Sequence, residues 1–275
     1  MLNLARLGHC LHLGLARDGL SLARTHRWGD PAFTLLAEQA LAPGACEDAG
    51  ALDAALAQLC AGHDLRGQRL RVVLADELVR LWSVTPPQGA ARLADLEAAC
   101  ALRFQGLYGD SLAGWELAAD WQADAPFLAC ALRASLGDSL ARAARDSGAL
   151  LTQVQPQLLA AWNRWCGKLD AAAWFALVQG DRLSLGISRA RRLHAVRVLR
   201  VTPEASLDWL AQQVAREALR LECAAPELLQ VCGAAPAQWV DGSHATLRVQ
   251  RLDHARRGLP PLSAAAQLSY SGVGA

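Results

Sequence analysis

Alternating apolar and polar residues open the chain and predict a β-hairpin. His9 to Arg17 alternates, Asp18-Gly19 is a strong turn signal, and the alternation resumes up to His26. Residues 33–41 fit either a third strand or a short helix, and apolar residues at helical spacing over 52–60 predict an amphipathic helix. The chain therefore begins with a hairpin, a third short element and a helix.

A similar order of elements recurs about 163 residues later. Residues 174–178 and 183–187 predict strands joined by the turn Gly180-Asp181, and 194–201 predicts a third strand. A helix with one apolar face follows from Pro203. This repetition predicts two β-β-β-α lobes with mixed sheets, which is a duplicated, ribonuclease-H-like α/β architecture.

The remaining periodicity divides the chain into parts. Residues 70–74, 78–84, 115–117, 127–132 and 150–155 predict strands, and 93–107, 136–144 and the segment entered through Pro156 predict helices. The predicted parts are a first lobe over 1–168 with an inserted subdomain around 76–132, a second lobe over 169–255, and a mobile tail over 256–275. The tail is assigned as mobile because it lacks periodicity.

Composition narrows the class of protein. Hydrophobic residues make up 53% of the chain and charged residues 19%, which supports a sizeable core and excludes disorder as the main state. The net charge of +1 gives no global electrostatic reason to bind nucleic acid. No apolar run approaches the roughly 18 residues of a membrane span, and no signal peptide is evident. We therefore expect a cytoplasmic protein without a direct membrane span. The eight scattered cysteines form no C-x-x-C pair, so we expect neither disulfides nor structural zinc.

Five segments together resemble a bacterial family. They are the hairpin His12-Leu13-Gly14-Leu15 through Ala23, Leu70 to Leu74, Val79-Arg80-Leu81-Trp82 before Pro86-Pro87, Leu128 to Leu132, and Val154-Gln155-Pro156 leading to Ala161-Trp162-Asn163. In these segments, and in element order over about residues 9–240, the chain resembles the actin-like cytoplasmic proteins of type IV pilus and type II secretion inner-membrane platforms. This is the PilM, GspL and MshI group. The resemblance implies a two-lobed actin-like ATPase fold.

The resemblance also implies a nucleotide cleft, but one that has lost its acids. Actin-like ATPases hold phosphates at the hairpin turns of both lobes, where a carboxylate helps to hold the metal. Ala16 stands where the first-lobe carboxylate belongs, and Val178-Gln179-Gly180 offers no acid at the matching place. Asp18 and Asp181 do lie in the two turns, but we explain both as turn-forming residues. The degenerate cleft would comprise Gly14, Asp18, Gly19, Gly180, Asp181 and Gly233. We therefore expect no cofactor or metal, with ATP and magnesium as the disfavoured alternative and weak or no hydrolysis.

By the same resemblance, the expected function is that of a non-catalytic scaffold. The expected partner is the cytoplasmic segment of a single-span inner-membrane pilus or secretion protein, which would hold the chain peripherally at the inner membrane. A secretion ATPase is a further candidate partner. The candidate contact residues are Arg80, Trp115 and Trp121.

A serine esterase is the second alternative. Gly-Asp-Ser-Leu occurs at 109–112 and at 137–140, and Asp241 precedes His244 with triad spacing, as in GDSL esterases. In that family, however, the serine motif follows the first strand, whereas the earlier copy here lies beyond residue 100. Ser139 would lie within an amphipathic helix, where we expect it to face solvent. The alternative requires Ser111 or Ser139 within hydrogen-bond reach of His244.

Overall fold

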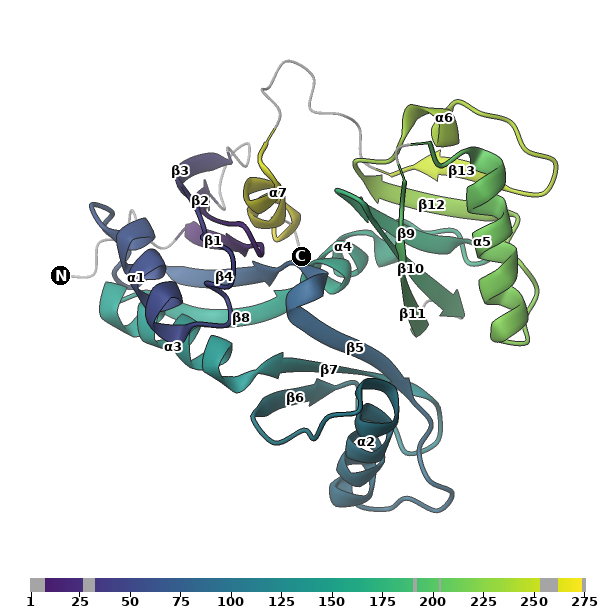
Figure 1. Cartoon of the computed structure of the whole chain (residues 1–275), viewed down its shortest axis with the longest axis horizontal. Helices are drawn as coiled ribbons and strands as arrows, with labels where there is room; N and C mark the ends of the chain where they lie inside the picture. The colour runs from purple at the N-terminus through teal and green to yellow at the C-terminus, as the bar shows by residue number, and fades with distance from the viewer. Residues whose placement is uncertain (1–7, 27–32, 190–191, 203, 253–261, 274–275) are drawn as a thin grey trace.

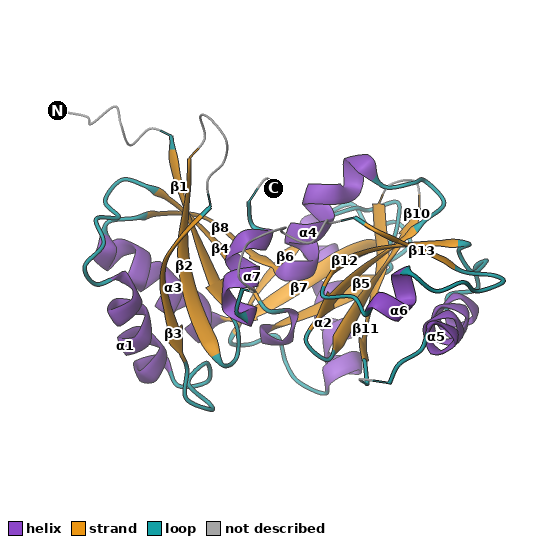
Figure 2. Ribbon diagram, turned by 90° about the horizontal axis from the view of Figure 1, so that it is seen from above, coloured by secondary structure: helices purple, strands orange, loops and turns teal. Residues whose placement is uncertain are grey.

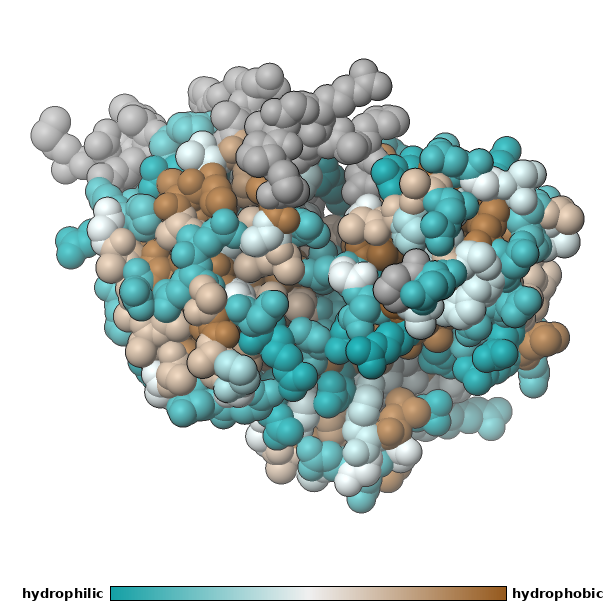
Figure 3. Space-filling view, turned by 45° about the horizontal axis from the view of Figure 1, so that its top comes forward, coloured by the Kyte–Doolittle hydropathy of each residue, from teal (hydrophilic) through white to brown (hydrophobic). Residues whose placement is uncertain are grey.

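The structure is a computed structural model that describes residues 8–26, 33–189, 192–202, 204–252 and 262–273. Two lobes, each built on a five-stranded sheet, lie side by side, and a smaller three-stranded subdomain extends from the first lobe (Figure 1). Apolar residues on the face shown in Figure 3 form small separate patches among polar ones. The largest fully buried side chains are apolar, among them Trp239, Phe104, Phe127 and Phe175.

The first sheet has the strand order β3-β2-β1-β4-β8. Its strands are β1 (His9–Leu15), β2 (Gly19–His26), β3 (Thr34–Ala40), β4 (Arg69–Leu74) and β8 (Leu150–Pro156). β1 pairs antiparallel with β2 and parallel with β4, because the chain crosses over through helix α1 (Ala49–Cys60) before it enters β4. Residues 34–40 therefore form the third strand rather than a short helix.

The second sheet repeats this arrangement with the order β11-β10-β9-β12-β13. Its strands are β9 (Trp174–Gln179), β10 (Arg182–Arg189), β11 (Arg192–Arg200), β12 (Leu228–Gly233) and β13 (Arg248–Arg251). β9 pairs antiparallel with β10 and parallel with β12, as β1 does with β2 and β4. The repetition read from the sequence is thus a repetition of sheet topology.

Helix α5 (Leu207–Arg220) covers this sheet but begins later than predicted. Pro203 lies outside the described residues, and Ser206 is the cap, accepting a hydrogen bond from the backbone N–H of Trp209. The cap therefore sets the first turn of the helix. The short helix α6 (Ala237–Val240) places Trp239, which is fully buried, against α5.

Helices lie on both faces of each sheet. α1 and α3 (Ala134–Ser147) cover the outer face of the first sheet, and α5 covers the outer face of the second (Figure 2). α4 (Gln157–Trp165) and α7 (Ala264–Ser271) lie between the two sheets. The inner layer joins the lobes, because Leu158 and Trp162 of α4 pack against Phe175 and Leu177 of β9.

The inserted subdomain is an antiparallel sheet with the order β5-β7-β6 and one helix. Its elements are β5 (Val79–Val84), α2 (Leu93–Tyr108), β6 (Trp115–Ala119) and β7 (Phe127–Arg133). It has a core of its own, in which Trp82, Phe104 and Phe127 are buried. A short 3-10 turn, η2 (Asp76–Leu78), connects it to the end of β4. This turn brings two acidic residues to the junction of the lobes.

The prediction of a mobile tail is wrong for residues 264–271, which form α7 and pack on the first sheet. The C=O of Ala265 accepts a hydrogen bond of 2.7 Å from the Ser21 hydroxyl, and the hydroxyls of Ser21 and Ser269 are 2.5 Å apart. Ala265 and Leu268 pack against Ala16 and Val73. The apolar face of this helix is made mainly of alanines, so its periodicity is weak in the sequence. Residues 256–261 lie outside the described residues.

A buried histidine beneath α7 makes stability depend on pH. His12 is 2% exposed, and its Nε2 lies 2.8 Å from the Thr25 hydroxyl. Burial, aided by the charge of Arg71, lowers the pKa of His12 from 6.5 to about 4. The unfolded chain therefore binds this proton first as pH falls, and the folded state is destabilised between those two values.

We expect the urea midpoint of the wild type to fall more steeply than that of His12→Asn as pH is lowered from 6.5 to about 4. The difference between the two proteins isolates His12 from carboxylates that titrate in the same range. Parallel curves for the two proteins would show that His12 is not the responsible group.

Candidate functional site

The two predicted hairpin turns lie on opposite sides of a small cleft between the lobes. The β1–β2 turn contributes residues 16–18, and the β9–β10 turn contributes residues 179–182. The cleft has a volume of about 300 Å³ and also includes residues of η2 and Ala264, the first residue of α7. Of the predicted cleft residues, Asp18, Gly180 and Asp181 line it, whereas Gly14, Gly19 and Gly233 are not among its lining residues.

Protein packing accounts for two of the predicted glycines. A Cβ atom on Gly14 would lie 2.2 Å from the backbone oxygen of Ala265, so β1 and α7 approach each other only with glycine there. Gly233 has a φ of +85°, and its Cβ atom would lie 2.1 Å from the Val178 backbone oxygen. Neither contact requires a bound phosphate.

The turn acids Asp18 and Asp181 lie at the two hairpin turns. Asp18 is exposed, and its C=O accepts a hydrogen bond from the backbone N–H of Leu41, while the N–H of Ala16 closes the turn by donating to the C=O of Gly19. Asp181 accepts a hydrogen bond of 2.8 Å from Nε of Arg200. Within the described residues, no group of three His, Cys, Asp or Glu side chains could hold a metal ion.

A carboxylate that the sequence analysis missed connects the two lobes. Asp76 of η2 is partly buried, and its Oδ1 accepts a 2.9 Å hydrogen bond from the backbone N–H of Leu158. Its Oδ2 accepts another, also of 2.9 Å, from the hydroxyl of Ser184, which lies on β10 of the second lobe. Desolvation raises the pKa of Asp76 to about 6, although the hydrogen bonds from Leu158 and Ser184 act in the opposite direction.

An ion pair lies beside this bond. Oε2 of Glu77, in the first lobe, lies 2.9 Å from Nη2 of Arg182, in the second lobe. We refer to Asp76, Glu77, Arg182 and Ser184 as the interlobe latch. The sequence contains one signal for it, because Asp76-Glu77 follows the end of the buried strand β4 by one residue, where parallel strands end at a common edge. That signal does not identify the partners on β10.

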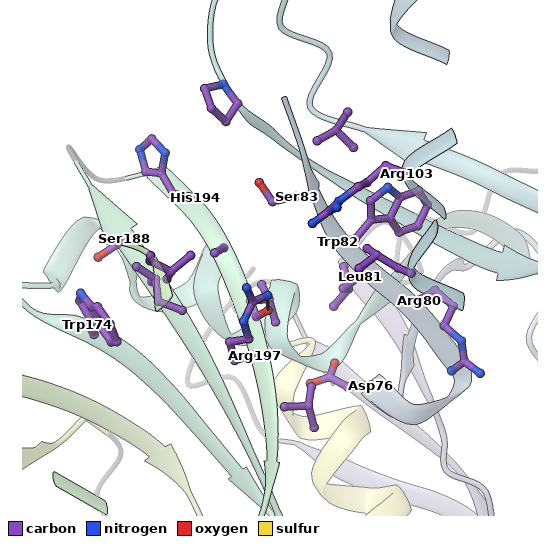
Figure 4. Close-up of a pocket in the computed structure, with 18 of the residues that line it drawn as sticks. Asp76, Arg80, Leu81, Trp82, Ser83, Arg103, Trp174, Ser188, His194 and Arg197 are labelled. Carbon is purple, nitrogen blue, oxygen red and sulfur yellow. Dashed lines mark hydrogen bonds between the residues drawn. The ribbon is translucent and has the colours of Figure 1, made fainter. Parts of the chain in front are cut away.

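A larger groove with a volume of about 1380 Å³ lies next to the latch. It runs between β5 of the inserted subdomain and β11 of the second lobe, and Arg103 and Arg197 extend into it (Figure 4). We call it the β5–β11 groove and define it by Arg80, Arg103, Leu107, Tyr108, Arg197 and Val198. Asp76, Glu77 and Arg182 line both the groove and the cleft. The latch therefore lies at the boundary between the two spaces.

The structure places only one of the three predicted contact residues in the groove. Arg80 lines the groove, with its guanidinium carbon 5.3 Å from the ring centre of Tyr108. Trp115 and Trp121 instead pack on the core of the inserted subdomain, with ring centres 5.4 Å from Phe104 and 5.9 Å from Phe127. Neither tryptophan is among the residues that line the groove.

The esterase residues are placed on different parts of the molecule. Ser139 is fully buried on the packed face of α3, so the expectation that it faces solvent is wrong. Ser111 lies in the loop between α2 and β6 and accepts a hydrogen bond from the N–H of Ala113. His244 lies in the loop between α6 and β13, where it contacts Thr246 and Asp208. The described hydrogen bonds join neither serine to His244.

No helix in the described part of the chain is long and apolar enough to cross a membrane. No protein-family model and no curated protein sequence matches the chain. Solved structures do match it, and the three described next cover 90% or more of its length.

Three examples have TM-scores above 0.5. The cytoplasmic domain of EpsL, an inner-membrane component of the type II secretion system of Vibrio cholerae, has a TM-score of 0.55 at 14% identity, covering 96% of this chain and 94% of that one. A chain of the PilM–PilN type IV pilus biogenesis complex has a TM-score of 0.62 at 16% identity, covering 90% and 89%. A protein of unknown function with an actin-like ATPase fold from Bacteroides thetaiotaomicron has a TM-score of 0.61 at 12% identity, covering 92% and 94%. The chain therefore has the predicted two-lobed actin-like fold and is PilM- and GspL-like in its structure.

Proposed function

We propose that this protein is a non-catalytic cytoplasmic scaffold in the inner-membrane platform of a type IV pilus or a type II secretion system. It would bind the cytoplasmic segment of a single-span membrane protein and so be held at the inner membrane. The likeness to a chain of the PilM–PilN complex and to the cytoplasmic domain of EpsL supports this assignment.

The interlobe latch is the observation that carries the non-catalytic part of the proposal. In actin-like ATPases, phosphates and a metal ion lie between the two hairpin turns. In this chain, Ala16 and Gln179 stand where the metal-holding carboxylates are expected, and Asp76 is hydrogen-bonded to Ser184 across the cleft. The volume of about 300 Å³ is at the lower limit for small-molecule pockets, which span roughly 300 to 1,000 Å³. These contacts between the lobes support the proposal that the lobes are held together without a nucleotide.

ATP with magnesium is expected to leave the thermal unfolding midpoint unchanged, because a ligand stabilises a protein only by binding its folded state. The measurement is a thermal scan with ATP, with ATP plus magnesium, and with magnesium alone, together with an assay of phosphate release. An actin-like ATPase with both carboxylates present serves as the positive control. A magnesium-dependent rise in the midpoint, or phosphate release that depends on this chain, would contradict the non-catalytic assignment.

The scaffold assignment is tested by recruitment to the membrane. The full chain is expressed with the single-span protein encoded beside its gene, and then with a version of that protein that lacks the cytoplasmic segment. We expect the chain in the membrane fraction with the intact partner only. An equal distribution in both cases, or the absence of any such neighbouring gene, would count against the scaffold.

A further inference from the structure

We propose that the β5–β11 groove binds an extended protein segment in which apolar and acidic residues alternate, laid along β11. This inference rests on the proposed scaffold function and names the place and the chemistry of the partner's docking.

The groove has the size and backbone surroundings for an extended chain. Its volume of about 1380 Å³ exceeds the roughly 300 to 1,000 Å³ of small-molecule sites. β5 and β11 are each the terminal strand of their sheet, so each has backbone N–H and C=O groups on one side that no neighbouring strand in its sheet pairs. An added strand satisfies such groups, which is a common way for proteins to bind peptides.

Both walls of the groove offer exposed apolar side chains. Leu107 and Tyr108, at the end of α2, are 45% and 38% exposed, and Val198 of β11 is 47% exposed. Large apolar side chains at the walls of a concave site are typical anchors for a partner. The side chains of a strand alternate between its two sides, so one side of a bound segment can supply the apolar residues that meet these walls.

The charges of the groove select an acidic partner. Among the described residues, neither Arg80 nor Arg103 forms an ion pair, although Arg80 lies over the rings of Tyr108 and Trp115. Arg197 is held at the groove by Glu217, with Nε and Oε2 3.1 Å apart. The lining carboxylates are engaged in the latch, where Glu77 pairs with Arg182 and Asp76 accepts its hydrogen bonds. A segment in the groove therefore meets arginines that attract carboxylates.

The recessed shape favours a peptide over a lipid surface. Figure 4 shows Arg103 and Arg197 directed into the space between β5 and β11 instead of out across a flat surface. A bilayer cannot enter such a groove. The membrane surface is therefore treated as an outcome that would overturn the proposal.

The test is a selection of displayed random peptides against the full-length protein, followed by fluorescence anisotropy with the selected peptides. We expect enrichment of peptides that alternate apolar residues with Asp or Glu. Their binding should weaken about tenfold in Arg103→Glu and should weaken with added salt. Arg145→Glu is the matched control, because Arg145 is an exposed arginine on α3 and its replacement changes the net charge equally. This control should bind as the wild type does.

Backbone pairing is tested with N-methylated versions of a selected peptide. Two peptides are compared, one methylated at the odd-numbered residues and one at the even-numbered residues. Only one of these two phases should abolish binding, because only every second N–H of the peptide faces β11. The proposal is overturned if no acidic peptides are enriched, if Arg103→Glu binds as tightly as Arg145→Glu, or if methylation has the same effect in both phases.

Two further outcomes separate this proposal from the scaffold function and from lipid binding. If Arg103→Glu is still recruited by the intact membrane partner, the groove assignment fails while the scaffold function stands. If the chain alone binds phosphatidylglycerol vesicles and Arg103→Glu does not, a lipid surface is the ligand and the proposal of a peptide ligand is overturned. Loss of recruitment in Arg103→Glu alone, with thermal stability unchanged, supports the groove.

Discussion

Replacing Asp76 by alanine is expected to lower the free energy of unfolding by about 2 to 3 kcal/mol. The substitution leaves the backbone N–H of Leu158 without its acceptor and removes the hydrogen bond of 2.9 Å to the Ser184 hydroxyl. Unsatisfied donors in a partly buried site are costly because water replaces the lost acceptor poorly. Urea unfolding followed by tryptophan fluorescence measures the loss.

The controls for this prediction separate the two lobes' contributions. Asp76→Asn keeps an oxygen for Leu158 and can donate from its amide group to Ser184, so we expect a smaller loss than in Asp76→Ala. A double-mutant cycle of Asp76→Ala with Ser184→Ala isolates the bond between the lobes. If the two substitutions are fully additive, Asp76 acts only within the first lobe and the latch does not exist as described.

Gly14→Ala is also expected to lower the free energy of unfolding by about 2 to 3 kcal/mol, because it overfills a closely packed contact. The added Cβ atom would lie 2.2 Å from the backbone oxygen of Ala265 and 2.8 Å from the Ser21 hydroxyl oxygen. A backbone atom cannot move aside as the end of a side chain can, so α7 must shift. Urea unfolding gives the loss, and hydrogen exchange of the α7 amides shows whether this helix is released.

Gly19→Ala is the matched control in the same hairpin. Its Cβ atom would lie 3.3 Å from the Gln39 backbone oxygen and 3.6 Å from the Ala265 Cβ atom, which small movements can accommodate. We therefore expect Gly19→Ala to be much less destabilising than Gly14→Ala. Equal effects of the two substitutions, or unchanged protection of α7 in Gly14→Ala, would contradict the assignment of Gly14 to packing.

The same latch connects the two proposals. Asp76, Glu77 and Arg182 line both the interlobe cleft and the β5–β11 groove. The contacts of the latch lie within the chain itself. A scaffold with a preformed groove loses less conformational entropy on binding its partner.

The local patterns of the sequence determined the elements and their repetition. The Asp18-Gly19 and Gly180-Asp181 turns, with alternating apolar and polar residues on either side, predicted two hairpins. The spacing of apolar residues predicted the strands and the helix of the inserted subdomain. These features depend on neighbouring residues, so they can be read along the chain. The sequence likewise showed Ala16 in the first hairpin and Val178-Gln179-Gly180 in the second, so neither has an acid at the position where actin-like ATPases are expected to hold the metal.

Only the tertiary structure decided which distant residues meet. Asp76 binds Ser184, the groove places α2 beside β11, and α7 returns to cover Gly14, although none of these pairs is near in sequence. The sequence alone did not show that the alanine-rich face of α7 is packed or that Ser139 is buried. Both depend on what these helices pack against. The physical reason is that burial and hydrogen bonding between lobes depend on surfaces assembled from separate segments, whereas hairpins and helices are set by turn chemistry and periodicity within one segment.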